Sequence, residues 1–441
     1  MKILLVNQKT SLNRGDMAIY NETLRLLRRS FPESCIVMTL RGREEENSFP
    51  DCTIINSLES WVVSVDSSGQ EKFTSPLQRI VDIIRLMLFV IYYRMSGRKI
   101  QCFFDYKKQA FLDACASADF VFGCGGGYLY DEYDSPQSIF SELIRLFSWD
   151  MFVLGEMLVP LAIGKPLVLL PQSIGPLRTR LKKYIISWIV RKANLTFVRE
   201  RESLYLLQKL GCSQRAMYMP DLAFGLPEGD REIAETLLKR AGLDRARYSF
   251  CVGMTAIDWG AQQRGFYRQA MYEQSLVACI DEITCQGGAV VLFAQCATLL
   301  PAWNDRIVNH RLKAAARDPQ HVYLVEDSPE PEQLQSLYGL MDYFVATRMH
   351  SAILAMNAGV PVITIGYLHK SRGIMREANL AEWCFDIGTV TPGELVRGFH
   401  RLRQLTVQDQ AQKYVAFAVR SKKALVVLLQ LVIERRAYCV H

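Results

Sequence analysis

The chain has 441 residues, of which half are hydrophobic and 22% are charged, and its formal net charge is +7. This composition is typical of a folded globular protein rather than a disordered one, and the length predicts two or three domains. The charge is too small and too evenly spread for a nucleic-acid-binding surface, which excludes that class of partner but not an anionic substrate or membrane surface.

The twelve cysteines are scattered singly between Cys35 and Cys439, and no C-x-x-C pair occurs. We therefore expect neither a metal site nor a redox motif, but reduced thiols in a cytoplasmic protein. The N-terminal run MKILLVNQKT is too short for a signal peptide and predicts a first strand instead.

Strands and helices alternate along the first half of the chain. Short aliphatic runs predict strands at 3–7, 36–40, 120–123, 166–171, 195–198 and 216–219. Helical spacing of apolar residues predicts helices at 16–30, 147–161 and 180–192. This alternation indicates a parallel sheet covered by helices on both faces.

An apolar segment at 80–93 interrupts this series. Asp82 and Arg85 lie within it, it is too short to span a bilayer, and three basic residues follow at once: Arg94, Arg98 and Lys99. We favour a helix buried in the N-terminal half. The alternative is an interfacial helix on anionic lipid, which would place the protein at the inner face of a membrane. For a second apolar run at 424–433, the same two alternatives remain: a buried helix or an interfacial one.

A polar stretch at 226–248 predicts the domain boundary. We expect an N-terminal domain at 1–228, with an apolar helical insertion at about 75–105, and a C-terminal domain at 229–441 with a helical tail from 391. The second domain repeats the alternation, with strands at 250–255, 289–294, 322–324, 343–346 and 360–365 and helices at 269–286 and 332–341. The fold class is therefore α/β, with two Rossmann-like domains facing across a cleft and ligands beyond the carboxyl ends of the strands.

The motif NRGD at 13–16 joins the first strand to the first helix. Asp16 is placed to cap that helix, and Gly15 permits a close backbone approach. The alternative is an anion site at the helix N-terminus with Arg14 and Asp16 beside it, and spacing alone leaves both open.

A glycine run follows the strand at 120–123 and includes Gly125, Gly126 and Gly127. It lacks the last glycine of a dinucleotide fingerprint and the Lys-Ser/Thr of a P-loop. It predicts either close approach of backbone to a ligand or close packing of a helix on the sheet.

Two further motifs end strands of the first half. PQSIGP at 171–176 predicts a loop that presents Gln172 and Ser173 at the rim of the sheet. VRERES at 198–203 predicts a solvated ion network, with a ligand-facing Arg199 as the exception. Asp221 follows the last strand of this half and is either a site residue or a helix cap.

The motif with the most chemistry is TRMHS at 347–351, directly after the strand at 343–346. It supplies Arg348 and His350, and Tyr367 and Lys370 follow the next strand. Three cationic groups at neighbouring strand ends indicate an acidic ligand.

Together these motifs resemble the polysaccharide pyruvyl transferase family: NRGD, GGG, PQSIGP, VRERES, PDLAF and RMHS…GVPVITIGY…K run in order from Asn13 to Lys370. The insertion and the tail after about residue 381 lie outside the resemblance. It implies a fold similar to GT-B glycosyltransferases and transfer of a pyruvyl group from phosphoenolpyruvate to two hydroxyls of one sugar, giving a cyclic ketal and phosphate. The acceptor would be a sugar of an exopolysaccharide, a cell-wall polymer or a lipid-linked precursor, and no metal or organic cofactor is expected.

The resemblance also suggests roles. We expect phosphoenolpyruvate on the C-terminal domain and the acceptor on the N-terminal one, with Arg348, Arg199 and Lys370 holding the donor's carboxylate and phosphate. His350 is the expected proton source, or else a donor to the phosphate that assists its departure, and Asp16 or Asp221 is the expected base. The remaining expected substrate-binding residues are Arg14, Gly15, Gly125, Gly126, Gly127, Gln172, Ser173 and Tyr367.

Two alternatives remain. A nucleotide-sugar glycosyltransferase of the same fold would also need basic residues in the second domain, but no E-x₆-E spacing that would suit its ribose and diphosphate occurs at the equivalent late strand. An inactive membrane-associated scaffold would not need Arg348, His350, Asp16 and Lys370 together.

Overall fold

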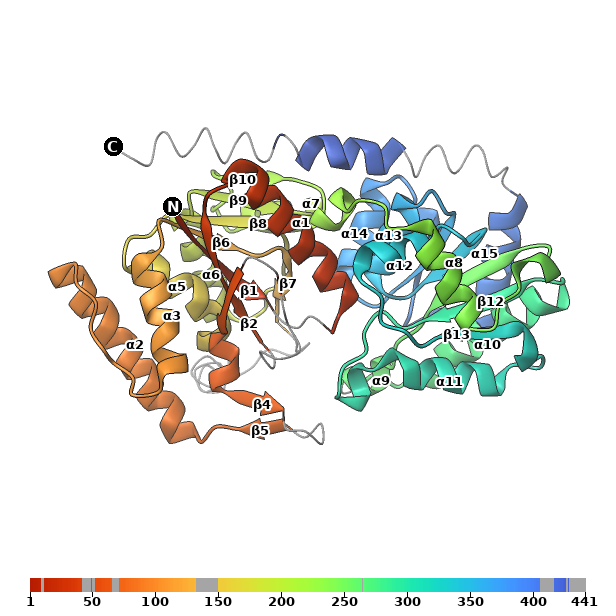
Figure 1. The fold of residues 1–441 in the computed structure, drawn as a ribbon, viewed down its shortest axis with the longest axis horizontal. Coiled ribbons are helices and arrows are strands. Elements are labelled where there is room, and N and C mark those ends of the chain that lie inside the picture. The colour runs from red at the N-terminus through yellow and green to blue at the C-terminus, as the bar shows by residue number, and fades with distance from the viewer. Residues whose placement is uncertain are drawn as a thin grey trace. The chain divides into compact units, whose positions relative to one another are not determined.

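Parallel β-sheets form the centres of two separate units in the computed structural model (Figure 1). The structure describes residues 1–8, 12–41, 49, 52–65, 71–131, 150–263, 265–404, 416–425 and 427. Among these, the first unit draws on Met1–Ser11, Ile19–Asp221 and Ala424–His441, and the second on Leu12–Ala18 and Leu222–Lys423. The short segment Leu12–Ala18 therefore belongs with the second unit although it precedes most of the first in sequence.

The first unit has a parallel sheet in the order β10-β9-β8-β6-β1-β2-β3, and β7 pairs with β8. Its strands are β1 (Lys2–Gln8), β2 (Cys35–Leu40), β3 (Cys52–Asn56), β6 (Phe120–Gly123), β7 (Gly126–Leu129), β8 (Leu167–Ile174), β9 (Leu195–Val198) and β10 (Ala216–Tyr218). A separate antiparallel pair comprises β4 (Val63–Val65) and β5 (Glu71–Phe73). The order reverses between β1 and β6, the type of point at which α/β sheets bind ligands.

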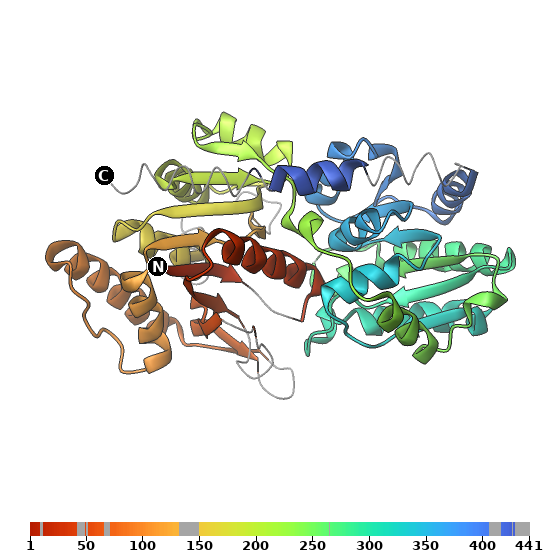
Figure 2. The same ribbon diagram turned by 45° about the horizontal axis from the view of Figure 1, so that its top comes forward.

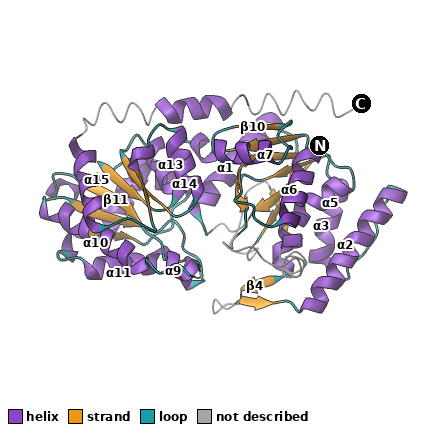
Figure 3. Cartoon of the chain, turned by 180° about the vertical axis from the view of Figure 1, so that it is seen from behind, coloured by secondary structure: helices purple, strands orange, loops and turns teal. Residues whose placement is uncertain are grey.

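The helices associated with this sheet are α1 (Arg14–Ser30), whose first turn belongs to the second unit, α2 (Pro76–Ser96), α3 (Tyr106–Ser117), α5 (Met151–Ala162), α6 (Arg180–Lys192) and α7 (Arg201–Lys209), with a short 3₁₀ turn at Leu58–Trp61. Figures 2 and 3 show helices on both faces of the sheet, as the strand–helix alternation predicts.

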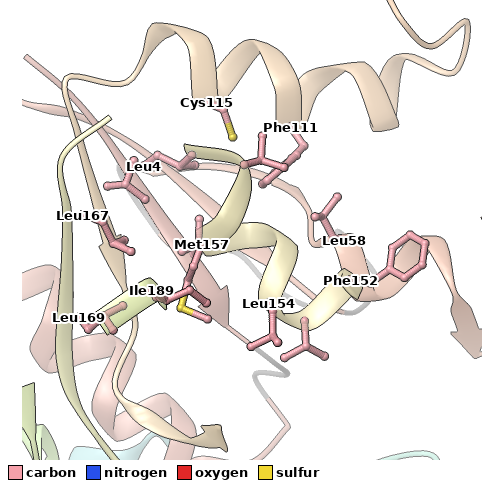
Figure 4. Packing of buried hydrophobic residues seen from close by; sticks show 14 of the residues in the cluster. Leu4, Leu58, Phe111, Cys115, Phe152, Leu154, Met157, Leu167, Leu169 and Ile189 are labelled. Atoms are coloured by element: carbon pink, nitrogen blue, oxygen red, sulfur yellow. The ribbon is translucent and has the colours of Figure 1, made fainter. Parts of the chain in front are cut away.

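One hydrophobic core lies between this sheet and the helices α3, α5 and α6 (Figure 4). Leu4 of β1 and Leu167 and Leu169 of β8 meet Met157 of α5 and Ile189 of α6 there. Leu167 and Leu169 share a face because strand side chains alternate with a period of two. Full burial of each such side chain stabilises the fold by about 1.5–3 kcal/mol.

The apolar segment predicted as a helix is the central part of α2. Its Ile83, Leu86 and Phe89 are buried in the same core, which confirms the predicted burial for one face. The opposite face is exposed, so the expectation of a wholly buried helix is wrong for that face. No helix of the described ranges is long and apolar enough to cross a membrane.

The second unit has a parallel sheet in the order β13-β12-β11-β14-β15-β16. Its strands are β11 (Cys251–Thr255), β12 (Ala289–Phe293), β13 (Val322–Val325), β14 (Tyr343–Ala346), β15 (Val362–Gly366) and β16 (Cys384–Asp386). In chain order this is the Rossmann arrangement 3-2-1-4-5-6, with the reversal between β11 and β14. Both sheets thus confirm the predicted two-domain α/β fold.

The helices of the second unit are α8 (Arg231–Arg240), α9 (Trp259–Gln262), α10 (Gln269–Cys285), α11 (Asp305–Ala315), α12 (Pro331–Tyr338), α13 (Met349–Asn357), α14 (His369–Glu377) and α15 (Pro392–Gln404). Residues 416–425 form a further helix, consistent with the predicted helical tail, whereas most of the apolar run at 424–433 lies outside the described residues.

Candidate functional site

The sequence motif with the most chemistry lies at the strand reversal of the second unit. Arg348 lies two residues after the end of β14 and is the N-cap residue of α13, and His350 is the second residue of that helix. The adjacent backbone is fixed by Thr347, whose N–H donates to the carbonyl of Thr255 at the end of β11 (3.2 Å). Both predicted side chains are therefore at the carboxyl edge of the sheet, and both are buried.

Arg348 forms an ion pair with Asp305, the first residue of α11. Its Nη2 donates to Oδ1 at 2.6 Å and its Nε donates to Oδ2 at 3.2 Å. The backbone N–H groups of Gln295 and Cys296 also donate to Oδ2. Burial alone lowers the pKa of Arg348, but the attraction of Asp305 outweighs it and raises the pKa above its usual value. The guanidinium is therefore held charged and in one orientation.

The NRGD motif packs against the same edge through its backbone. The N–H of Ala297 donates to the carbonyl of Leu12 (3.1 Å), and the N–H of Arg14 donates to the carbonyl of Gln295 (2.9 Å). The Arg14 Nη2 reaches the carbonyl of Ser328 (2.5 Å), and its Nη1 lies 3.4 Å from the Glu330 carboxylate. These contacts explain why Leu12–Ala18 belongs with the second unit.

Gly15 lies directly against the imidazole of His350. A Cβ atom at this position would lie 2.4 Å from His350 Nδ1 and 2.6 Å from Gln295 Nε2, well inside van der Waals contact. Ser351, on the next position of α13, donates to the Gln295 amide oxygen. Gly15 therefore permits the close approach that its place in the motif predicts.

Asp16 is the third residue of α1, in its first turn, and accepts a hydrogen bond from Asn13 Nδ2 (2.9 Å). The expectation that Asp16 is the cap is therefore wrong, because the helix already starts at Arg14. Its charge still contributes to the site, since Asp16 is one of the carboxylates that raise the pKa of Tyr367.

Tyr367 follows β15 and completes this edge. Burial raises the pKa of its hydroxyl above the usual value, although the charge and hydrogen bonding of Arg348 oppose that shift. The ring packs on Trp259, with centroids 4.6 Å apart. Lys370 is the second residue of α14 and is partly buried. The structure thus groups Arg14, Gly15, Arg348, His350 and Tyr367, and two residues that the sequence did not single out, Asp305 and Gln295, connect them.

Four of the predicted residues lie in the first unit, in and beside β8. Gln172 and Ser173 are buried within that strand, so the predicted rim loop is wrong. Pro171 has no backbone N–H to donate. The strand continues past it because the register with β9 shifts between Leu169 and Gln172, so no hydrogen bond between the two strands is lost there. No described residue hydrogen-bonds the Gln172 amide group.

Arg199 is fully buried, which corrects the expectation of a solvated ion network for its motif. Its Nη1 donates to Asp221 (2.5 Å) and its Nε to Ser173 Oγ (2.8 Å), and the Ser173 hydroxyl donates to Glu200 (3.0 Å). Asp221 thus pairs with Arg199 inside the first unit. A charge can be buried here because carboxylates on both sides of the guanidinium compensate for its lost hydration.

The predicted glycine loop also lies in the first unit. Gly125 precedes β7, and Gly126 and Gly127 are its first residues, with Gly126 opposite Gln172 of β8. Gly126 has a φ of 147°, which favours glycine over other residues.

A buried carboxyl group at the ends of β1 and β2 was not predicted. Glu156 of α5 accepts hydrogen bonds from the N–H of Asn7, the hydroxyl of Thr39 and the N–H of Leu58, each at 2.7 Å. Asn7 has a left-handed φ of 68°. Burial raises the pKa of Glu156 to about 7, against the three hydrogen bonds that lower it. Helical spacing places Glu156 in an apolar stretch, and a carboxyl group inside such a stretch is the signal that could have identified it.

Within the described residues, no group of three or more His, Cys, Asp or Glu side chains could hold a metal ion. The cysteines of these ranges are all free thiols. One of them, Cys296, lies beside Asp305, and burial raises its pKa to about 12, so it is a neutral thiol near neutral pH.

Known proteins resemble this chain over most of its length. The family model for polysaccharide pyruvyl transferase matches residues 13–369. The chain is 24% identical over 440 residues to the amylovoran biosynthesis protein AmsJ of Erwinia amylovora, covering 96% of this chain and 97% of AmsJ.

Solved structures with the same fold include Anabaena HepE in complex with UDP-glucose, at a TM-score of 0.54 and 12% identity over 99% of this chain and 100% of that one. A UDP-GlcNAc 2-epimerase from Neisseria meningitidis has a TM-score of 0.55 at 10% identity over 98% of this chain and 100% of the epimerase. These likenesses show a GT-B-like fold and nothing finer. With the family match spanning most of its length, the chain belongs to the polysaccharide pyruvyl transferase family.

Proposed function

We propose that the protein transfers a pyruvyl group from phosphoenolpyruvate to two hydroxyls of one sugar in the synthesis of an exopolysaccharide. Membership of the family supports pyruvyl transfer, and the relative named for amylovoran biosynthesis supports a polysaccharide acceptor. The single observation that carries the donor assignment is the charged, buried Arg348 beside His350 at the strand reversal of the second sheet. A preorganised cation there suits a small, strongly acidic donor.

Arg348 binds the donor in this proposal, and Asp305 orients it. Because Asp305 contacts Nε and Nη2, the donor would meet the guanidinium through Nη1. Arg348 and Asp305 together carry no net charge. Lys370 therefore supplies the further positive charge that a carboxylate and a phosphate require in this proposal, because Arg14 lies 3.4 Å from the Glu330 carboxylate.

The chemistry proceeds in two additions. His350 gives a proton to the methylene carbon of phosphoenolpyruvate as the first sugar hydroxyl forms a bond to the central carbon and loses its proton. The bond from that carbon to the phosphate oxygen then breaks. The second hydroxyl adds in its place, closing the ketal, and its proton leaves with the phosphate. Of the two hydroxyl protons released, one replaces the proton given by His350 and the other leaves with the phosphate. We propose Asp16 as the base that accepts the proton from the sugar hydroxyl.

The first unit supplies the acceptor side in this proposal. Gln172 is buried without a described hydrogen-bond partner, so its amide is able to bind a sugar hydroxyl. Arg199 is held by Asp221 and Ser173, so we propose that it shapes this strand end and leaves donor binding to Arg348. The glycines Gly125 to Gly127 would let the backbone approach the acceptor.

The test is direct. Purified protein is incubated with phosphoenolpyruvate and galactosyl, mannosyl or glucosyl acceptors, and phosphate release and acceptor mass are followed together. We expect phosphate release that depends on the acceptor and a mass gain of one pyruvyl ketal. A parallel incubation replaces phosphoenolpyruvate with UDP-sugars, because HepE was crystallised with UDP-glucose. Glycosyl transfer in that arm without pyruvylation in the first would refute the proposal.

The variant that tests the proton source is His350→Gln, which keeps a polar side chain of similar size. We expect it to lose at least a hundredfold in kcat. The exposed His310→Gln is the matched control, since its imidazole lies on α11 at the surface and pairs with Glu326. Equal turnover in the two variants would exclude His350 as the proton source.

A further inference from the structure

Helix α2 carries an apolar stripe on the side that faces away from its own core. Six apolar residues, each three or four positions after the last, form this outer face: Leu77, Ile80, Ile84, Leu88, Ile91 and Met95. Their side chains are between 50% and 84% exposed. At 3.6 residues per turn they fall within an arc of about 80°, along a helix about 30 Å long. Scattered exposed apolar residues are ordinary, but a continuous stripe of this length marks a binding surface.

The exposure is built into the fold rather than produced by a loosely held helix. The inner face is anchored in the core by Ile83, Leu86 and Phe89. The buried Asp82 of the same face pairs with Lys108 of α3 at 2.5 Å. Both ends are capped, by the Ser75 hydroxyl and by Gly97 in the left-handed conformation. Figures 1 and 3 show α2 as the outermost helix of its unit, beyond α3.

The charges around the outer face are mainly positive. Residues 71–105 contain six basic side chains and three acidic ones: Asp82, which is buried and paired, and Glu71 and Asp105 at the two ends of the range, where Asp105 caps α3. Arg94, Arg98 and Lys99 are exposed at the end of the helix, and no carboxylate of the described ranges pairs with them. Phe104 is 94% exposed just beyond this basic end. An apolar stripe with cations and an aromatic ring at its end is the pattern of a helix that lies in a lipid–water interface.

We propose that the outer face of α2 binds the surface of a membrane that contains anionic lipid, with α2 parallel to that surface. The six apolar side chains would enter the boundary of the acyl chains, and the basic end would contact the phosphate headgroups.

A second copy of the chain fits this face less well. An antiparallel pairing of two such helices would bring each basic end against Leu77 and its neighbours, where the partner helix offers no exposed carboxylate. A parallel pairing would bring the two basic ends together. Either arrangement leaves the positive charges uncompensated, whereas anionic headgroups neutralise them.

The experiment is co-sedimentation of the full chain with vesicles of phosphatidylcholine alone and of phosphatidylcholine with phosphatidylglycerol, at low and high salt. We expect binding to the anionic vesicles that weakens at high salt. The variant Ile84→Gln/Leu88→Gln/Ile91→Gln removes half of the outer face and should lower the partition coefficient at least tenfold. Its matched control is Ile233→Gln/Leu299→Gln/Ile307→Gln, which alters three apolar residues of the second unit that are 39–49% exposed and should bind as the unaltered chain does.

A second variant keeps the test independent of the apolar substitutions. Arg94→Gln/Arg98→Gln/Lys99→Gln should lower binding at least fivefold at low salt and lose most of the salt dependence. Far-UV circular dichroism and thermal melting check that each variant is folded.

Three results would overturn the proposal: no binding of the unaltered chain to anionic vesicles, equal binding by the outer-face variant, or a concentration-dependent dimer that this variant abolishes without any vesicle binding. Vesicle binding is measured without phosphoenolpyruvate or sugar. Its outcome is therefore independent of whether the chain proves to be a pyruvyl transferase.

Discussion

Gly15→Ala is the perturbation that most directly tests the proposed role of His350. The new Cβ would lie 2.4 Å from Nδ1 of the imidazole, whereas an ordinary contact requires at least 3.4 Å. The imidazole must therefore withdraw by about 1 Å, and overpacking of this kind costs about 1–3 kcal/mol. Alanine is favoured over glycine inside a helix by about 1 kcal/mol, and Gly15 lies in the first turn of α1. We expect the two effects to leave a net loss of about 0–2 kcal/mol, so the protein stays folded.

The effect on turnover should be far larger than the effect on stability. A displacement of about 1 Å at a reacting group costs about a hundredfold in rate. We expect kcat for acceptor-dependent phosphate release to fall by about that factor, while KM for phosphoenolpyruvate changes little, because Arg348 and not the imidazole holds the donor in our mechanism. Urea denaturation measures the stability change alongside the kinetic assay.

The matched control is Gly393→Ala in α15. There an added Cβ meets only the flexible end of Arg397, at 3.2 Å, so the variant reports the change in helix propensity without a clash at the site. We expect it to retain turnover. If Gly15→Ala also kept kcat within threefold while His350→Gln was inactive, the reasoning would fail, because the imidazole would then work from a position that Gly15 does not contact.

Three further predictions concern stability. Asp305→Ala leaves the Arg348 guanidinium buried without its partner and should cost about 3–5 kcal/mol in urea denaturation; a variant as stable as the unaltered chain would show that the pair contributes nothing. Glu156 has a folded pKa raised to about 7, so its contribution to stability is present below about pH 4.5 and is lost as pH rises through 7. Between pH 4.5 and 8, the unaltered chain should therefore lose up to about 3 kcal/mol of unfolding free energy relative to Glu156→Gln. If denaturation gave the same difference between the two proteins at both pH values, the shifted pKa would be contradicted. Met157→Ala opens a cavity in the core of the first unit and should cost about 2–5 kcal/mol, whereas Met95→Ala, at an 84% exposed position, should change the unfolding free energy by less than about 0.5 kcal/mol; equal losses measured by denaturation would mean that Met157 is not a core residue.

Strands buried on both faces could be predicted from the sequence because such strands read as unbroken apolar runs. The predicted bounds of 120–123, 195–198 and 343–346 agree with β6, β9 and β14. Prediction failed at β8, where Pro171, Gln172 and Ser173 suggest a loop. The strand continues there because a register shift accommodates the proline, and because Arg199 and Glu200 supply partners for Ser173 from the neighbouring strand end. Neither fact is visible in the local sequence.

The candidate site was likewise predicted only in part. Arg348 and His350 could be identified because they directly follow a predicted strand. Asp305, which fixes the guanidinium, lies 43 residues away in sequence, and Gln295 lies at the end of the strand on the far side of β11 from β14. The order of strands in the sheet brings these residues together, and that order cannot be derived from spacing along the chain. Sequence therefore predicted the residues proposed to contact the donor but not the residues that hold them in position.

The NRGD motif shows why a helix-start interpretation and a site interpretation need not exclude one another. The segment is held by backbone hydrogen bonds, from Ala297 to Leu12 and from Arg14 to Gln295, and by the Arg14 side chain, which donates to the carbonyl of Ser328. Asp16 favours the helix from within its first turn, where a negative charge is stabilised by the helix dipole, and it also acts electrostatically on Tyr367. Gly15 belongs to that same turn and contacts His350. The start of one helix therefore fixes the position of two charged side chains and one close contact at the edge of the second sheet, and this is why a motif near the N-terminus of the chain is part of a site built from residues beyond 290.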